Sequence, residues 1–412
     1  MVPLPTLQRP AQASQTKSIP LIRVASIDIL RALTMVLMIF VNDLGSLKNI
    51  PTWLGHVPQG VDGIGLSDVV FPAFLFIVGL SLPFAMENRR KKGDTELQLV
   101  KHVLVRSFAL LVMGVFLVNG ETINGTATGM PRYLWNTLSC LSFILLWNIY
   151  PKHVNRYLVY AAEATGIVIL IVLAVIYRGG EDGQIYQFSP QWWGILGLIG
   201  WAYLAGGLIT VFSKNSFWMI LGAWIFFSVL SMVNKAGYIP GDSIVSFIPN
   251  AILGGTLTGL TLGGVLTAIM FRYFRNRNDN RMMTIVFVAF AVLLIILSVI
   301  TRPYWKLAKL GATPAWLFLC SAFTLLAFTA VYWIADVKGK TGWSKIIRPA
   351  GTDTLLCYLI PYFVYAIFRA INFHWPDAII TGGVGLMKSL LLALLCVYIT
   401  GMLNKAGVRL KL

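Results

Sequence analysis

The sequence predicts an all-α fold, a polytopic transmembrane helical bundle of about 10–12 spans with both termini in the cytosol. Three observations carry this prediction. Hydrophobic residues make up 57% of the 412 residues and charged residues only 12%, whereas a soluble domain carries about 25% charge. The mean hydropathy is +0.75. Apolar runs of about 17–22 residues, each long enough to cross a bilayer, recur along the chain.

Twelve apolar segments are candidate spans. They cover residues 25–43, 66–86, 101–119, 134–150, 157–177, 192–212, 216–233, 250–271, 283–301, 315–335, 353–371 and 384–403. Short connectors within 134–177 and 192–233 leave ten or eleven spans as the alternative. Residues 1–22 are polar and lack an early apolar core, so we expect a cytosolic tail rather than a cleaved signal peptide, followed by a membrane domain over 23–412.

Basic residues set the expected orientation, because Lys and Arg gather in cytosolic loops. Here they fall in alternate connections: Arg23, 89–92, Lys152, Arg156, 272–281, 338–348 and 405–411. The outer side then carries the loops that contain His56, Glu121, Glu181, Asp182, His374 and Asp377. The net charge of +17 reflects these loops and does not predict a nucleic-acid partner.

One basic loop falls on the outer side. It contains Arg302, Lys306 and Lys309 next to Tyr304 and Trp305. Aromatic residues anchor chains at the membrane interface, so an interfacial turn is one interpretation. The other is a cationic rim that binds an anionic substrate through Arg302 and Lys306.

Small residues crowd the segment 253–264, which is rich in Gly and Thr. Small side chains let membrane helices approach closely, so helix packing is the favoured interpretation and the lining of a substrate path the second. Such faces also allow a homodimer. The cysteines have no metal-ligand spacing, and we expect reduced core residues at Cys140, Cys320, Cys357 and Cys396.

Ionisable residues inside apolar segments are costly and are usually functional or paired. Asp28 and Arg31 lie three residues apart at the cytosolic end of the first span, so they share a helix face. They form either a structural ion pair or part of a cofactor site. Arg106 and Arg348 also face the cytosol and are candidate ligands for phosphate groups.

Polar residues also flank the first outer loop. Asn42 and Asp43 end the first span, His56 lies in the loop, and Asp68 begins the second span. An imidazole titrates near neutral pH and can act as a general base. A carboxylate from Asp68 would orient it, although Asp68 could instead cap its own helix. Asn42 could stabilise an oxyanion, and we expect these four residues at one outer mouth.

Several of these residues also carry a family resemblance. Residues 26–31 (SIDILR), Phe40 to Asn42, His56 and residues 65–79 resemble the heparan-α-glucosaminide N-acetyltransferase family. A later block, with residues 336–339, Trp343, residues 349–351 and residues 355–358, resembles it too. The chain looks closest to the bacterial branch of that family, some members of which are described as amino-sugar transporters.

The resemblance implies transfer of an acetyl group across the membrane. Acetyl-CoA would bind from the cytosol, and a terminal glucosamine or related amino sugar on the far side would accept the acetyl group. The family's active His matches His56, and its Asn and Asp match Asn42 and Asp68. Residues 57–63 replace the family's Trp-Asn-Gly, and the luminal N-terminal domain of the lysosomal members has no counterpart here. By analogy the location is a bacterial inner membrane.

The implied reaction also gives roles to the remaining candidate residues. Arg31 and Arg106, with Asp28 and Arg348, would hold the cofactor, whereas Asp43 would contact the substrate. Two rival functions stay open. A transporter explains the spans and buried ions but predicts a midplane site and an inverted repeat. An acetyltransferase that modifies hydroxyls of envelope glycans would share the same chemistry.

Overall fold

The computed structural model describes residues 24–181, 183–240 and 247–410. The tail 1–22, together with Arg23, Asp182 and Lys411, lies outside the described residues. Within the described ranges the chain is helical, and β-structure is limited to isolated bridges. The α-helices are α1 Ala25–Asp43, α2 Leu66–Lys91, α3 Glu96–Glu121, α4 Gly125–Thr128, α5 Arg132–Trp147, α6 Arg156–Ile176, α7 Ile195–Phe212, α8 Phe217–Lys235, α9 Asn250–Leu253, α10 Thr256–Asn276, α11 Asn280–Thr301, α12 Pro314–Tyr332, α13 Arg348–Thr352, α14 Thr354–Ala370 and α15 Gly382–Lys405.

The predicted fold class is confirmed. Ten of the described helices are long and apolar enough to cross a membrane. Each of the twelve predicted segments has a helix, but α5 has 16 residues and α14 has 17, which places both below the length of the other ten. The segment expected at 250–271 is divided, because Gly255 has a φ of +73° and separates α9 from α10.

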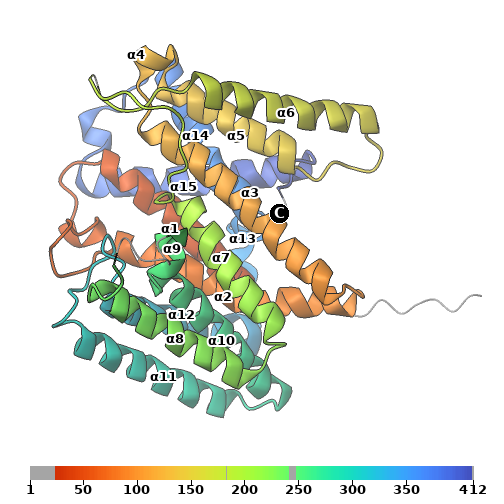
Figure 1. The fold of residues 1–412 in the computed structure, drawn as a ribbon, viewed down its shortest axis with the longest axis vertical. Helices are drawn as coiled ribbons and strands as arrows, with labels where there is room; N and C mark the ends of the chain where they lie inside the picture. The colour runs from red at the N-terminus through yellow and green to blue at the C-terminus, as the bar shows by residue number, and fades with distance from the viewer. Residues whose placement is uncertain (1–23, 182, 241–246, 411–412) are drawn as a thin grey trace, which may run out of the picture.

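The bundle has two ends, which we name by a residue at each. The loop between α1 and α2 lies at the His56 end, and the turn between α2 and α3 lies at the Arg89 end (Figure 1). The first helix begins at the Arg89 end, where the Ser26 N–H donates to Asp336 after α12. The last described residues return there, since the Leu410 N–H donates to Asp353 before α14. Both described ends of the chain therefore lie on one side, as the sequence predicts.

Close helix packing in the bundle depends on glycine. A Cβ added at Gly264 of α10 would collide with the backbone of Phe76 in α2, and one added at Gly79 of α2 would collide with Thr261. The Gly- and Thr-rich segment therefore brings α10 against α2, as predicted. Its residues line neither of the two cavities described below. The four cysteines are free and buried.

Candidate functional site

His56 and Asp68 form a hydrogen-bonded pair at the His56 end. Nδ1 of His56 lies 2.7 Å from Oδ1 of Asp68. The imidazole is 48% exposed, whereas the carboxylate is 1% exposed. A carboxylate can only accept, so Nδ1 carries the proton and Nε2 keeps a lone pair. Among the described residues no hydrogen bond occupies Nε2. The pair therefore has the arrangement of a general base, with a half-exposed imidazole whose Nε2 is free of described hydrogen bonds.

The carboxylate of Asp68 is held rigidly by the start of α2. Its Oδ2 accepts hydrogen bonds of 3.0 Å from the N–H groups of Val57 and Gly65. Its backbone oxygen accepts a 2.9 Å bond from the indole of Trp316 in α12. Asp68 thus caps its helix and orients His56 at the same time, which joins the two interpretations that the sequence left as alternatives.

A lysine from the loop between α11 and α12 also reaches this pair. Nζ of Lys309 lies 3.3 Å from Nδ1 of His56 and 3.5 Å from the backbone oxygen of Ser67. Burial lowers the pKa of Lys309. The sequence placed Lys309 in an outer basic loop but gave no reason to bring it to His56, 253 residues away.

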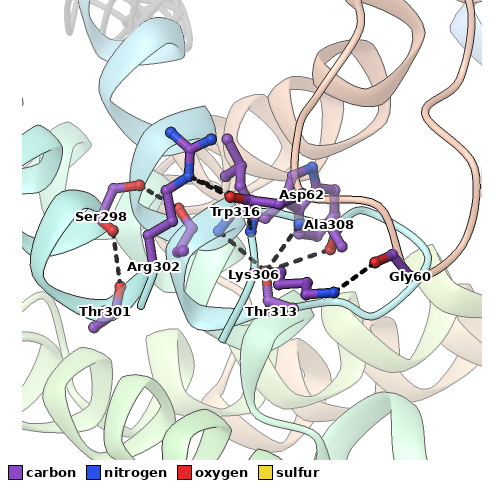
Figure 2. A network of polar contacts seen from close by, with 11 residues as sticks. Gly60, Asp62, Ser298, Thr301, Arg302, Lys306, Ala308, Thr313 and Trp316 are labelled. Atoms are coloured by element: carbon purple, nitrogen blue, oxygen red, sulfur yellow. Dashed lines mark hydrogen bonds and ion pairs between the residues drawn. The ribbon is translucent and has the colours of Figure 1, made fainter. Parts of the chain in front are cut away.

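Arg302 and Lys306 bind the loop that carries His56 (Figure 2). The guanidinium of Arg302 donates to both oxygens of Asp62 at 3.0 and 3.1 Å, and Lys306 donates to the Gly60 oxygen at 2.9 Å. The hydrogen bond from the Leu307 N–H, helped by Arg302, lowers the pKa of Asp62. The structure thus shows a loop anchor, and the predicted role of Arg302 and Lys306 in substrate binding stays a prediction.

Asp43 belongs to a separate buried cluster near the end of α1. Its Oδ2 lies 2.6 Å from Nζ of Lys388 and 2.5 Å from the hydroxyl of Ser389, both in α15. Its Oδ1 accepts a 2.8 Å bond from Tyr365 of α14. The side chains of Asp43 and Lys388 are 2% and 8% exposed. The expected convergence of Asp43 with His56 is not seen in the described contacts.

Asn42 lines a cavity of about 800 Å³ at the His56 end, which we call the outer cavity. No described hydrogen bond joins Asn42 to His56. The outer cavity lies between the ends of α1, α3, α5, α7 and α14. Its lining residues include the polar side chains Asn42, Glu121, Arg132, Tyr133, Asn136, Tyr358, Tyr362, Tyr365, Arg369 and Asn372.

A second cavity, the inner cavity, has a volume of about 550 Å³ and lies at the Arg89 end. Its charged lining residues are the cations Arg31, Arg89, Lys92 and Arg106 and the carboxylates Asp28 and Asp353. The cations outnumber the carboxylates, so the inner cavity favours an anionic ligand. Both cavities fall within the range of about 300–1,000 Å³ that small-molecule sites occupy.

The predicted pair of Asp28 and Arg31 forms in the inner cavity, with 3.6 Å between charged atoms. Arg31 also donates to Ser81 of α2 at 2.7 Å and to the Gly351 oxygen of α13 at 3.2 Å. It therefore connects three helices while it lines the cavity, which suits both the structural and the binding interpretation.

Arg106 and Arg348 differ in position. The guanidinium carbon of Arg106 lies 4.7 Å from the ring centre of Tyr203, and its buried Nε has no hydrogen-bond partner among the described residues. Arg348 is exposed and does not line the inner cavity. The geometry places Arg106, but not Arg348, where a phosphate could be bound.

The two cavities meet inside the bundle. Ile195 of α7 and Tyr358 of α14 line both. Along α1, Asp28 and Met38 line the inner cavity, whereas Ile39 and Asn42 line the outer one. Consecutive turns of one helix thus pass from one cavity to the next, and the side chains of Ile195 and Tyr358 border both.

A family model described as a domain of unknown function (DUF5009) matches residues 23–254. The chain belongs to this family. The matched region includes α1 to α3, and therefore His56, Asp68, Arg31 and Arg106.

Two curated proteins are related to part of the chain. Heparan-alpha-glucosaminide N-acetyltransferase from Mus musculus is 35% identical over 97 residues, and the Homo sapiens protein of the same name is 32% identical over 97 residues. Each match covers 24% of this chain and 14% of the relative. The chain is thus related to a membrane acetyltransferase over a limited region.

Most residues of the outer cavity were not among those predicted from the sequence. Tyr358, Tyr362, Tyr365 and Arg369 recur at spacings of four, three and four residues, which places them on one face of a helix. This periodicity was available in the sequence. The periodicity does not predict that Arg132 of α5 lines the same cavity, because only tertiary packing brings α5 against α14.

Proposed function

We propose that the protein is a membrane acetyltransferase. It moves the acetyl group of acetyl-CoA, taken from the cytosol, to the amine of a terminal glucosamine or related amino sugar on the outer side. The observation that carries this proposal is the pair of cavities that enter from opposite ends and share Ile195 and Tyr358. The names of the relatives supply the reaction class. The proposed location is the cytoplasmic membrane of a bacterium.

The residues of the inner cavity suit the nucleotide part of acetyl-CoA. Phosphate groups prefer guanidinium partners, and Arg106 offers a buried Nε without a partner among the described residues. Arg31 of α1 also lines the wall of this cavity. The acyl end of the ligand would then point toward Tyr358, where the cavities meet.

The reaction balances without a metal or redox partner. The acceptor nitrogen forms a bond to the thioester carbonyl carbon, and the carbon–sulfur bond breaks to release the CoA thiolate. Nε2 of His56 takes the proton of the attacking amine, and Asp68 stabilises the imidazolium through Nδ1. The proton then leaves to the thiolate or to water. The amide of Asn42, on the outer cavity, would donate to the oxyanion.

His56 lines neither cavity, so its role is the sharpest point to test. Tyr365 is the rival base, because it lines the outer cavity and donates to Asp43. We would purify the full chain in detergent and measure transfer of radiolabel from acetyl-CoA to glucosamine for the wild type, His56→Ala and Tyr365→Phe. The matched control is His153→Ala, an exposed loop histidine at the Arg89 end.

We expect labelled N-acetylglucosamine from the wild type and from His153→Ala, and a loss of about 100-fold or more in His56→Ala. Full activity in His56→Ala with loss in Tyr365→Phe would move the base to the outer cavity. Label that hydroxylamine releases would identify an ester and therefore O-acetylation. Failure to bind CoA would contradict the proposal and favour the transporter.

A further inference from the structure

The residues that line the outer cavity carry more positive than negative charge. Its ionisable lining residues, apart from tyrosines, are Arg132, Arg369 and Glu121. Arg132 attracts the Glu121 carboxylate. In the described part of the chain, neither guanidinium has an ion pair or a side-chain hydrogen bond with a protein group. One carboxylate cannot pair fully with two guanidinium groups, so the lining of the cavity keeps an excess of positive charge.

The two arginines lie at the ends of two neighbouring helices. Arg132 begins α5, where the helix dipole adds partial positive charge. Arg369 lies in the last turn of α14, one turn after Tyr365. The adjacent helices α5 and α14 present both side chains to one space. This arrangement differs from an ordinary surface cluster, because the lining residues surround a volume that can hold a ligand.

Neutral groups in the cavity add hydrogen-bonding capacity. Asn136 lines the cavity, and its Oδ1 is buried near Gly120 without a described partner. The hydroxyl proton of Tyr365 is committed to Asp43, which is held in turn by Lys388. The Tyr365 oxygen can therefore accept a bond from a ligand hydroxyl. The lining thus offers donors for an anion and an acceptor for a polyol.

We propose that the outer cavity recognises an anionic group, a carboxylate, sulfate or phosphate, on a hydroxyl-bearing ligand, which Arg132 and Arg369 bind together. Where the proposed acetyl transfer holds, this ligand is the acceptor, and the enzyme prefers acidic amino sugars to neutral ones. The anion site itself does not depend on acetyl transfer, since it rests on the cavity and its arginines.

Binding in the absence of acetyl-CoA tests this proposal. Full-length protein in nanodiscs of phosphatidylcholine would be titrated by calorimetry with glucosamine, glucosamine 6-sulfate, glucosamine 6-phosphate and inorganic phosphate. The variants are Arg132→Gln and Arg369→Gln. The matched control is Lys48→Gln, which removes an exposed cation at the same end that pairs with Asp377 and does not line the cavity.

We expect glucosamine 6-sulfate and glucosamine 6-phosphate to bind at least about 10-fold more tightly than glucosamine, which corresponds to about 1.4 kcal/mol. Each arginine variant should remove most of this preference, and Lys48→Gln should retain it. Weak competition by inorganic phosphate is also expected. Competition by phosphatidylglycerol added to the nanodiscs would identify a lipid headgroup as the source of the anion and would still support the site.

Equal binding of the two anionic sugars and of glucosamine by the wild type would overturn the proposal. So would a preference that survives in Arg369→Gln and Arg132→Gln, provided that both variants elute and melt as the wild type does. Acetyl transfer is measured separately. Charge-selective binding without acetyl transfer would support the anion site and contradict the proposed function. Acetyl transfer without charge-selective binding would support the proposed function and contradict the anion site.

Discussion

Asp68 holds the imidazole of His56 with one carboxylate oxygen and the start of its own helix with the other. Oδ1 lies 2.7 Å from Nδ1 of His56, and Oδ2 accepts from the N–H groups of Val57 and Gly65. The orientation of the base is thus fixed by the same group that begins α2, so any movement of the helix start would also move the imidazole.

The Asp68→Asn variant should retain the fold and lose acetyl transfer. The amide could donate to Nδ1 of His56, which would shift the imidazole proton to Nε2 and occupy the lone pair that the reaction needs. We expect transfer to fall about 100-fold or more and the free energy of unfolding to fall by about 1 kcal/mol through the weaker cap. Steady-state rates and melting curves would be compared with those of Asp62→Asn, and equal rates in both variants would contradict the orienting role.

The buried pair of Asp43 and Lys388 should behave as a unit. Lys388→Met would leave the Asp43 charge with only hydroxyl partners and should cost about 3–5 kcal/mol. Asp43→Asn together with Lys388→Met removes both charges and should recover most of this loss. Chemical denaturation in detergent would measure the cycle. If the double variant were as unstable as the sum of the two single variants, the residues would not be coupled.

Close contact between α2 and α10 predicts intolerance at Gly264. An added methyl group would collide with the backbone of Phe76, which cannot rotate away, so Gly264→Ala should lower the melting temperature sharply or prevent folding. Gly222→Ala in α8 is the matched control, because a Cβ there meets open space. Fluorescence-detected gel filtration would compare the two. Similar elution and melting of both variants would show that α2 and α10 lie farther apart.

Asp353, which precedes α14, should make stability depend on pH. Burial raises the pKa of Asp353 from its ordinary value near 3.8 to about 6, so the folded state binds more protons than the unfolded state between about pH 4 and pH 6. Stability contributed by this group is therefore complete below pH 4 and lost as the pH rises through 6. Asp353→Asn should melt like the wild type at pH 4 and be more stable at pH 7.5, by up to about 3 kcal/mol. If the stabilities of the wild type and Asp353→Asn changed with pH in the same way, Asp353 would not be the source of the pH dependence.

The sequence predicted the local features of the site better than its long-range ones. His56 lies in the loop that leads into the helix of Asp68, so their contact could be expected, and the helices follow from apolar runs whose lengths match a bilayer. Lys388 meets Asp43 across 345 residues and Lys309 meets His56 across 253. The helical periodicity of the sequence does not predict contacts between residues so far apart in the chain. Arg302 was predicted at a substrate rim, but the sequence could not show that Asp62 lies close enough to bind it.

The outer cavity illustrates the same limit. One face of α14 supplies Tyr358, Tyr362 and Tyr365, and this stripe is visible in the sequence as a helical repeat. A stripe of aromatic residues usually packs in a core or faces lipid. Only the position of α5 and α3 decides that this one borders a space with Arg132 and Glu121.

The shared wall of Ile195 and Tyr358 has an electrical consequence. Water in two opposed cavities would carry the potential of each bulk phase inward, so most of the membrane voltage would fall across the side chains between the cavities. An elementary charge that crosses 100 mV changes its free energy by about 2.3 kcal/mol. An uncharged acetyl group is indifferent to that field, but a proton or sodium ion is not. The width of the wall therefore determines whether a cell could hold its ion gradients while this protein works.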